Sequence, residues 1–148
     1  ALTKVFLDAT GAQDERDLME GLSYDRYHLF PFIAVEVVNT ARAGDPAARE
    51  VMQWAGEELG WLAISVARQI EMENEAVEVV QSGTIFEAGE LITKPMQDIV
   101  IKHVPKAKLI RLEGPPVVGP LMLGMQMAGL DPYPLRKKLI ESAKQLVE

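Results

Sequence analysis

Residues 76–112, AVEVVQSGTIFEAGELITKPMQDIVIKHVPKAKLIRL, run through a strand pattern, a glycine, a helical pattern and a second strand pattern. The dense β-branched valines at the start predict a buried strand over about 77–82, which ends at Gly83. We expect a helix over about 89–103 and a second strand over 107–112. Two strands joined through one helix predict a short parallel βαβ unit, so the fold class is α/β.

A long helix precedes this unit. Asp45 and Pro46 are a strong start signal, because Asp accepts bonds from the first free N–H groups and Pro at the first helical position needs no partner. We expect the helix to reach about Glu73, where a run of acidic residues opposes the helix dipole and favours fraying. Pro95 should kink the next helix or mark a restart within it. The predicted apolar stripe of the long helix consists of Val51, Trp54, Ala55, Leu59, Leu62, Val66 and Ile70.

Further helical patterns make the chain helix-rich. By contrast, only two strands are predicted, which is too few for a free-standing parallel sheet. Either further strands are hidden in the helical patterns or the sheet is completed elsewhere. The 148 residues suit one domain over 1–148. We expect the other helices over 2–9 with Gly11 as the stop, after an Asp14 cap, between Pro31 and Gly44, over 117–128 and from Pro134 to about Val147.

Composition excludes several classes of protein. The net charge of −7 argues against nucleic-acid binding, which depends on Lys and Arg neutralising phosphates. With no cysteine, disulfides and thiolate metal sites are excluded, and a reducing compartment fits. The longest apolar run is far short of the ~20 residues that cross a bilayer, and no secretory signal pattern is present. We therefore expect a cytoplasmic protein with no membrane partner.

The segment from Gln81 to Thr84 is the candidate site that the residues themselves suggest. It follows a buried strand and precedes a helix, and ligands bind α/β folds at the carboxyl ends of parallel strands. Gly83 would let a ligand approach closely, because it has no Cβ. A plain strand-to-helix turn is the alternative interpretation, and the motif alone does not decide between the two.

Three ordered segments support a resemblance. They are AGDPAAREVMQWAGEELGWLAISVARQI (43–70), VEVVQSGTIFEAGELITKPMQDIV (77–100) and GPPVVGPLMLGMQMAG (114–129). In this order and with these gaps, the chain over roughly 30–130 resembles the C-terminal lobe of N-acetylglucosamine kinase and the BadF/BadG/BcrA/BcrD ATPases. These families belong to the superfamily of actin, sugar kinases and heat-shock chaperone ATPases.

The resemblance implies a ribonuclease-H-like C-terminal nucleotide-binding lobe, with ATP in a cleft against an N-terminal lobe that is absent from this chain. It assigns Ser82, Gly83 and Thr84 to the adenosine-binding turn. It matches Gly119 with the glycine of the second connecting helix near the lobe hinge. Pro120 departs from the family pattern, which has Ala at that place.

The resemblance also implies that Mg²⁺ and the ATP phosphates are held mainly by the other lobe. The same lobe would supply the catalytic carboxylate. The parent would transfer a phosphoryl group to a sugar hydroxyl or to water, and this chain alone would be inactive. An N-acetylhexosamine kinase acting on an amino sugar is preferred over the reductase-activating branch, whose iron–sulfur clusters need cysteines. The phosphoryl acceptor stays open.

A second hypothesis comes from a different class: a non-catalytic helical dimerisation or interaction module. Its support is the methionine-rich helix over 117–128, which could form an adaptable apolar surface. Core packing explains the same residues equally well. A lobe separated from its partner would also expose an apolar patch, so a homodimer is expected under either hypothesis.

Overall fold

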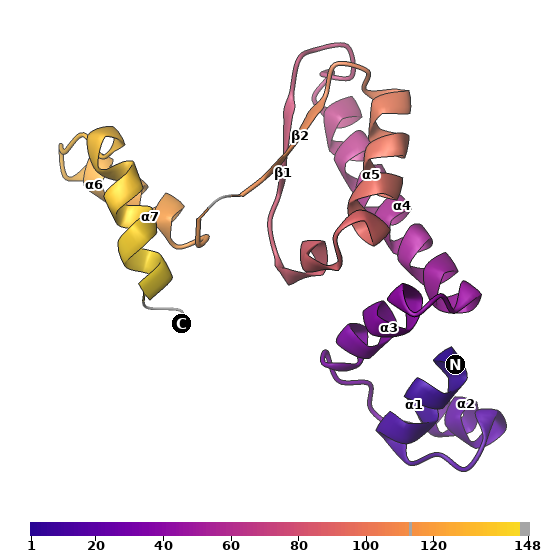
Figure 1. The fold of residues 1–148 in the computed structure, drawn as a ribbon. Helices are drawn as coiled ribbons and strands as arrows, with labels where there is room; N and C mark the ends of the chain where they lie inside the picture. Colours follow the sequence, from indigo (N-terminus) through magenta and orange to yellow (C-terminus); the bar gives the residue numbers. More distant parts are fainter. Residues whose placement is uncertain (113, 146–148) are drawn as a thin grey trace.

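The computed structural model describes residues 1–112 and 114–145 and gives a helix-rich α/β fold with a small parallel sheet. Figure 1 shows a long helix at the centre, with a second helix and the sheet beside it. In chain order the elements are α1 (Leu2–Thr10), α2 (Glu15–Ser23), α3 (Ile33–Arg42), α4 (Pro46–Gln69), β1 (Glu78–Gln81), the 3₁₀ helix η1 (Thr84–Ala88), α5 (Glu90–His103), β2 (Lys108–Arg111), α6 (Val118–Met127), the 3₁₀ helix η2 (Tyr133–Leu135) and α7 (Arg136–Gln145).

The predicted βαβ unit is confirmed. β1 pairs with β2 in parallel, from Glu78 opposite Lys108 to Gln81 opposite Arg111, and α5 connects the two strands. Both strands therefore end at the same edge of the sheet. Within the described residues, the sheet has these two strands only. One face packs on α4 and α5 through a cluster in which Ile64, Met96, Val100 and Val104 are buried and Val77, Val79 and Leu109 lie against them.

The contact between α4 and α5 is close because glycine stands where the helices meet. A Cβ built on Gly56 would lie 2.5 Å from the carbonyl oxygen of Ile92 and 3.1 Å from Cβ of Pro95. One turn further, Gly60 lies directly against Ile99. Two glycines four residues apart share one face of a helix, so they form a flat strip that admits the backbone of α5.

The N-terminal helices attach to this core through α3. Ile33, Val37 and Ala41 of α3 are buried against Met52 of α4 and Ile92 of α5, and α1 packs on the same cluster. The predicted caps are confirmed: Gly11 closes α1 in the left-handed conformation, and the Asp14 carboxylate accepts a bond from the backbone N–H of Asp17.

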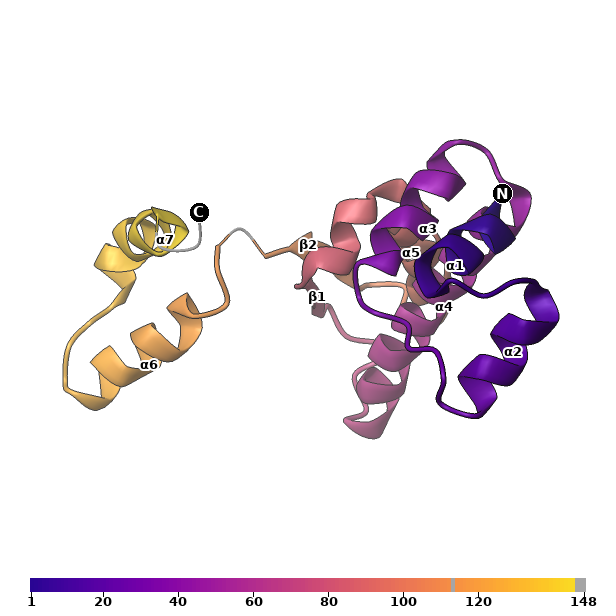
Figure 2. The same cartoon turned by 90° about the horizontal axis from the view of Figure 1, so that it is seen from below.

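The C-terminal helices form a separate hairpin. Figures 1 and 2 both show α6 and α7 beside one another and set apart from the other elements. Gly114, between β2 and α6, packs against Ile140 of α7. Apart from Val118, the residues of α6 are half-buried or exposed. The predicted end of the last helix at Val147 lies outside the described residues.

Two sequence-based expectations about α4 are wrong, and one of the two alternatives for Pro95 in α5, a restart of the helix, is excluded. α4 ends at Gln69 rather than near Glu73, because Glu71 turns into the left-handed region and the acidic residues that follow oppose the dipole. Pro95 lies inside one uninterrupted helix, so no restart occurs there. The predicted stripe of α4 is not its buried face, and Trp54 (62% exposed) and Leu62 (65% exposed) face outward. The buried residues are Ala48, Met52, Gly56, Gly60, Ile64 and Ala67.

Among the described helices, none has both the length and the apolar character that crossing a membrane requires.

Candidate functional site

The predicted adenosine turn lies at the carboxyl edge of the sheet. Ser82 and Gly83 link the end of β1 to η1, whose first residue is Thr84, and all three are exposed. Gly83 has φ 110° and ψ 159°, a backbone conformation open to glycine and strained for any other residue. A Cβ at this position would meet no atom within 4 Å. The glycine is thus required by the chain path, and the space above it is free.

Arg111 holds this turn from the neighbouring strand. Its Nη1 donates to the carbonyl oxygen of Gly83 at 3.0 Å and lies 3.4 Å from that of Gln81. The guanidinium carbon lies 5.2 Å from the ring centroid of Phe86 in η1, which is cation–π geometry. The sequence analysis did not single out Arg111. The signal was the strand register, which places Arg111, the last residue of β2, beside Gln81, the last residue of β1.

Gln81 anchors the strand side of the same turn. It is 7% exposed, and its amide nitrogen lies 3.6 Å from the sulfur of Met96 on α5. Its carbonyl oxygen also accepts the backbone N–H of Leu112 at 2.9 Å. The turn therefore starts from a fixed, buried residue and is clamped by Arg111, so its backbone is preorganised.

Beside the turn, a cavity of about 480 Å³ lies between α3 and η1. Sites for small ligands commonly fall between about 300 and 1,000 Å³ and are mostly apolar with a few polar groups. Thr84 contributes to the wall of this cavity, whereas Ser82 and Gly83 do not. The α3 side of the lining consists of Pro31, Ala34, Val35, Val38, Asn39 and Arg42, and the other side consists of Thr84, Ile85, Glu87 and Ala88.

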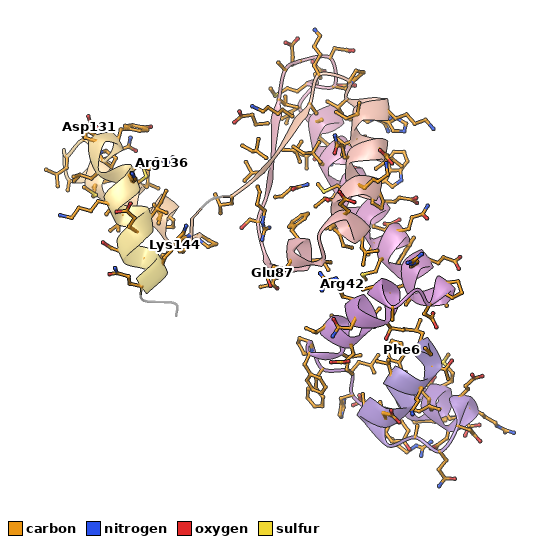
Figure 3. The ribbon with its side chains drawn as sticks, viewed as in Figure 1. Phe6, Arg42, Glu87, Asp131, Arg136 and Lys144 are labelled. Carbon is orange, nitrogen blue, oxygen red and sulfur yellow. The ribbon has the colours of Figure 1, made fainter. Side chains whose placement is uncertain are left out.

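One hydrogen bond spans the cavity. Figure 3 shows Arg42 of α3 and Glu87 of η1 facing one another, and Nη2 of Arg42 donates to the backbone carbonyl of Glu87 at 3.0 Å. The bond ties α3 to η1 and fixes the width of the cavity between them. The sequence analysis missed this wall altogether, because α3 precedes the turn by some forty residues and no local pattern connects them.

Gly119 does not join this group. It lies in the first turn of α6, is exposed, and has open space around it. Because α6 belongs to the hairpin set apart from the sheet in both views, the structure does not bring Gly119 to the Ser82–Thr84 turn. Pro120, the residue that departs from the family pattern, also falls in the first turn of α6. A helix tolerates proline there because the first N–H groups have no partner within the helix.

The described residues offer little for acid–base or metal chemistry. No group of three or more His, Cys, Asp or Glu side chains in this part of the chain could hold a metal ion. The pKa of Asp17 is lowered by hydrogen bonds from the backbone N–H of Gln13 and the hydroxyl of Tyr27. That of Asp45 is lowered to about 2, chiefly by the N-terminal amine of Ala1 at 2.9 Å. Both carboxylates hold local structure away from the cavity lining, so neither is a candidate catalytic acid or base.

Comparison with known proteins adds no relative: no family model, curated protein or solved structure matches this chain.

Proposed function

We propose that this chain is the ATP-binding C-terminal lobe of an actin-like ATPase or sugar kinase with a ribonuclease-H-like fold. The observation that supports it most directly is the Ser82–Thr84 turn, which is exposed at the carboxyl edge of a parallel sheet and borders a cavity of suitable size. A clamped, glycine-containing turn at that edge is where an α/β fold accepts a nucleotide. Val80, on the sheet face away from α4 and α5, is 53% exposed, and within the described residues each strand is paired along one edge only. Both features fit a sheet that is completed by another part of the parent.

In this proposal the lobe contributes binding rather than chemistry. Phosphoryl transfer depends on Mg²⁺, a phosphate cradle and a residue that orients the nucleophile. The turn and the cavity offer shape and apolar contact for the adenosine end of ATP. Mg²⁺ and the phosphates are assigned mainly to the other lobe, together with the catalytic carboxylate. Within the family we prefer an N-acetylhexosamine kinase, whose phosphoryl acceptor is an amino sugar, located in the cytoplasm.

The test is a titration of the ¹⁵N-labelled 148-residue chain with ATP, followed by NMR. We expect weak binding, with Kd on the order of 1 mM, because half of the cleft is supplied by the other lobe. The amide signals of Ser82, Gly83 and Thr84 should shift most. The absence of any shift at several millimolar ATP would contradict the proposal.

The turn can also be probed by substitution. Gly83→Ala strains the backbone. Weaker ATP binding by that variant could therefore come either from the added methyl group at the site or from a distorted turn. Thr84→Trp places bulk at the cavity wall without that strain, and it should remove ATP binding. Gly129→Ala is the matched control for strain, because Gly129 has φ 76° and lies in the C-terminal hairpin. ATP binding should survive Gly129→Ala.

A second candidate function, a helical dimerisation or interaction module, has one observation in its favour. α6 exposes Leu121, Leu123 and Met127, the last at 83%. Exposed apolar faces of this kind mark surfaces that another protein covers. The two candidates separate in the same titration: a pure interaction module gives no nucleotide-dependent shifts, whereas an ATP-binding lobe does.

A further inference from the structure

Three side chains meet near the carboxyl ends of α4 and α5. Trp61 and Arg68 are two turns apart on one face of α4, and His103 is the last residue of α5. The ring centroids of Trp61 and His103 lie 4.7 Å apart, with the rings tilted by 44°. The guanidinium carbon of Arg68 lies 6.0 Å from the centroid of the Trp61 ring, and its Nη2 lies 3.3 Å from Nδ1 of His103.

The contact between Arg68 and His103 fixes the charge of the imidazole. A guanidinium has donors only, so Nδ1 of His103 is the acceptor and carries no proton. The ring is therefore neutral while the contact stands. Protonation would put a donor on Nδ1 opposite another donor, and a positive charge beside the one on Arg68. A proton on His103 therefore breaks this hydrogen bond.

The protonated ring has reasons to keep its place. The face of a tryptophan ring attracts a cation, and the imidazole already lies against Trp61. The carboxyl end of a helix also favours positive charge, and His103 ends α5. Arg68 is exposed, whereas Trp61 and His103 are half-buried. Arg68 is therefore the member of the cluster that is free to move away.

Neighbouring charges do not replace the lost contact. The charged residues of the segments that adjoin the cluster are Lys102, Lys106, Glu71, Glu73 and Glu75. The two lysines add positive charge on the side of α5. None of these carboxylates, nor any other in the described part of the chain, lies within 4.0 Å of a ring nitrogen of His103. His28, the second histidine, differs in this respect, because its Nδ1 lies 3.4 Å from the carboxylate of Asp25.

We propose that Arg68, Trp61 and His103 form a proton-operated latch between the ends of α4 and α5. With His103 neutral, Arg68 bridges the two helices. With His103 protonated, the imidazolium stays on Trp61 and Arg68 is released. Histidine is the side chain that ordinarily changes charge between about pH 5 and pH 8, so a proton can operate the latch in that range. Both strands begin after these helix ends, so the latch lies at the edge of the sheet opposite the Ser82–Thr84 turn and is independent of nucleotide binding.

The experiment follows the ¹⁵N-labelled chain by NMR from about pH 7 to about pH 5. The Nε–H signal of Arg68 and the indole N–H signal of Trp61 should shift with the same midpoint as the ring protons of His103. Hydrogen exchange at the amide of Ile70, which donates to the carbonyl of Val66 in the last turn of α4, measures the opening. Its protection factor should fall about threefold, in the lower part of the range for one hydrogen bond, because the contact is exposed.

Three variants separate the latch from other effects of pH. His103→Asn keeps an acceptor for Arg68 that no proton converts into a donor, so the signals of Arg68 and Ile70 should stay near their pH 7 values. In Arg68→Ala the His103 ring should still titrate, while the protection of Ile70 is low at every pH. His28→Asn is the matched control, because it removes the other histidine of the chain, and the native response should persist.

Two results would overturn the proposal. One is a response of Arg68 and Ile70 that persists in His103→Asn or disappears in His28→Asn. The other is a native chain in which the His103 ring titrates while the Arg68 signal does not move.

Discussion

Gly56 of α4 lies so close to Ile92 of α5 that a Cβ on the glycine would stand 2.5 Å from the Ile92 carbonyl oxygen. The neighbouring atom belongs to the backbone of a packed helix, so it cannot move aside without shifting α5. α5 in turn connects β1 to β2, and η1 leads directly into it. This one contact therefore sets the distance between the long helix and the elements that form the candidate site.

The Gly56→Ala variant tests that relationship. We expect the free energy of unfolding to fall by about 1–3 kcal/mol, the usual cost of overfilling a packed contact, although alanine favours a helix more than glycine does. Urea denaturation followed by circular dichroism measures it. Gly124→Ala is the matched control, because Gly124 lies in α6 with no atom near its missing Cβ, and it should be stabilising by about 0.5–1 kcal/mol. Equal stability of the two variants would contradict the prediction.

The acid limb of the stability profile should depend on Asp45. Its pKa is lowered from 3.8 to about 2, first by the Ala1 amine and then by the backbone N–H of Ala48. Since the folded value lies below the unfolded one, its contribution to stability is present above about pH 4 and is lost as the pH falls toward 2. Asp45→Asn keeps the helix cap, because Asn caps as well as Asp, but removes the charge.

We expect Asp45→Asn to lower the free energy of unfolding at pH 6 and to flatten its decline between pH 4 and pH 2. Urea titrations at a series of pH values follow both changes without screening charges. If the variant and the native chain lose stability in parallel over this interval, Asp45 is not the source of the decline.

α6 should drive self-association of the 148-residue chain, because Leu121, Leu123 and Met127 are exposed on it. Leu123→Glu puts a charge into that surface and should shift the chain toward monomer in sedimentation equilibrium. Ser65→Glu adds the same charge at an exposed polar position of α4, away from α6, and the association should persist. A native chain that stays monomeric at high concentration would rule out this role for α6.

The chain by itself should not turn over ATP. Phosphoryl transfer needs positioned Mg²⁺ and charge stabilisation on the transferred group, and the described residues contain no cluster suited to a metal ion. A coupled ADP-release assay with Mg²⁺, with and without N-acetylglucosamine, should give the rate of a buffer blank. Release above the blank that disappears in Thr84→Trp would show that the chain is catalytic by itself.

Local signals in the sequence predicted the elements well. Asp14, the Asp45–Pro46 pair and Gly11 mark helix ends because capping depends on one residue and its nearest neighbours. The valines of β1 and the length of α5 similarly predicted the parallel βαβ unit. For the caps, the deciding interaction lies within the element or one turn away, whereas the pairing of β1 with β2 follows from the rule that two strands joined through one helix run parallel.

The packing of one helix against another could not be predicted in the same way. The apolar pattern of α4 pointed to the face with Trp54 and Leu62, whereas the buried face is built on Gly56 and Gly60. A glycine strip gives no hydropathy signal, because its role is to let another backbone approach. The cavity beside Thr84 escaped prediction for a related reason: its far wall comes from α3, and only tertiary packing brings that helix to the turn.

The C-terminal hairpin of α6 and α7 differs from the rest of the chain in how far apart in sequence its contacting residues lie. α6 and α7 meet across a short loop, so their hairpin can form from neighbours in sequence. β1 and β2 must first close a loop that contains the whole of α5, and α3 must reach η1 across some forty residues. Local contacts form faster than distant ones. During folding, the hairpin should therefore be complete while the turn at Gly83 is still unclamped, and the candidate site should be among the last parts of the chain to form.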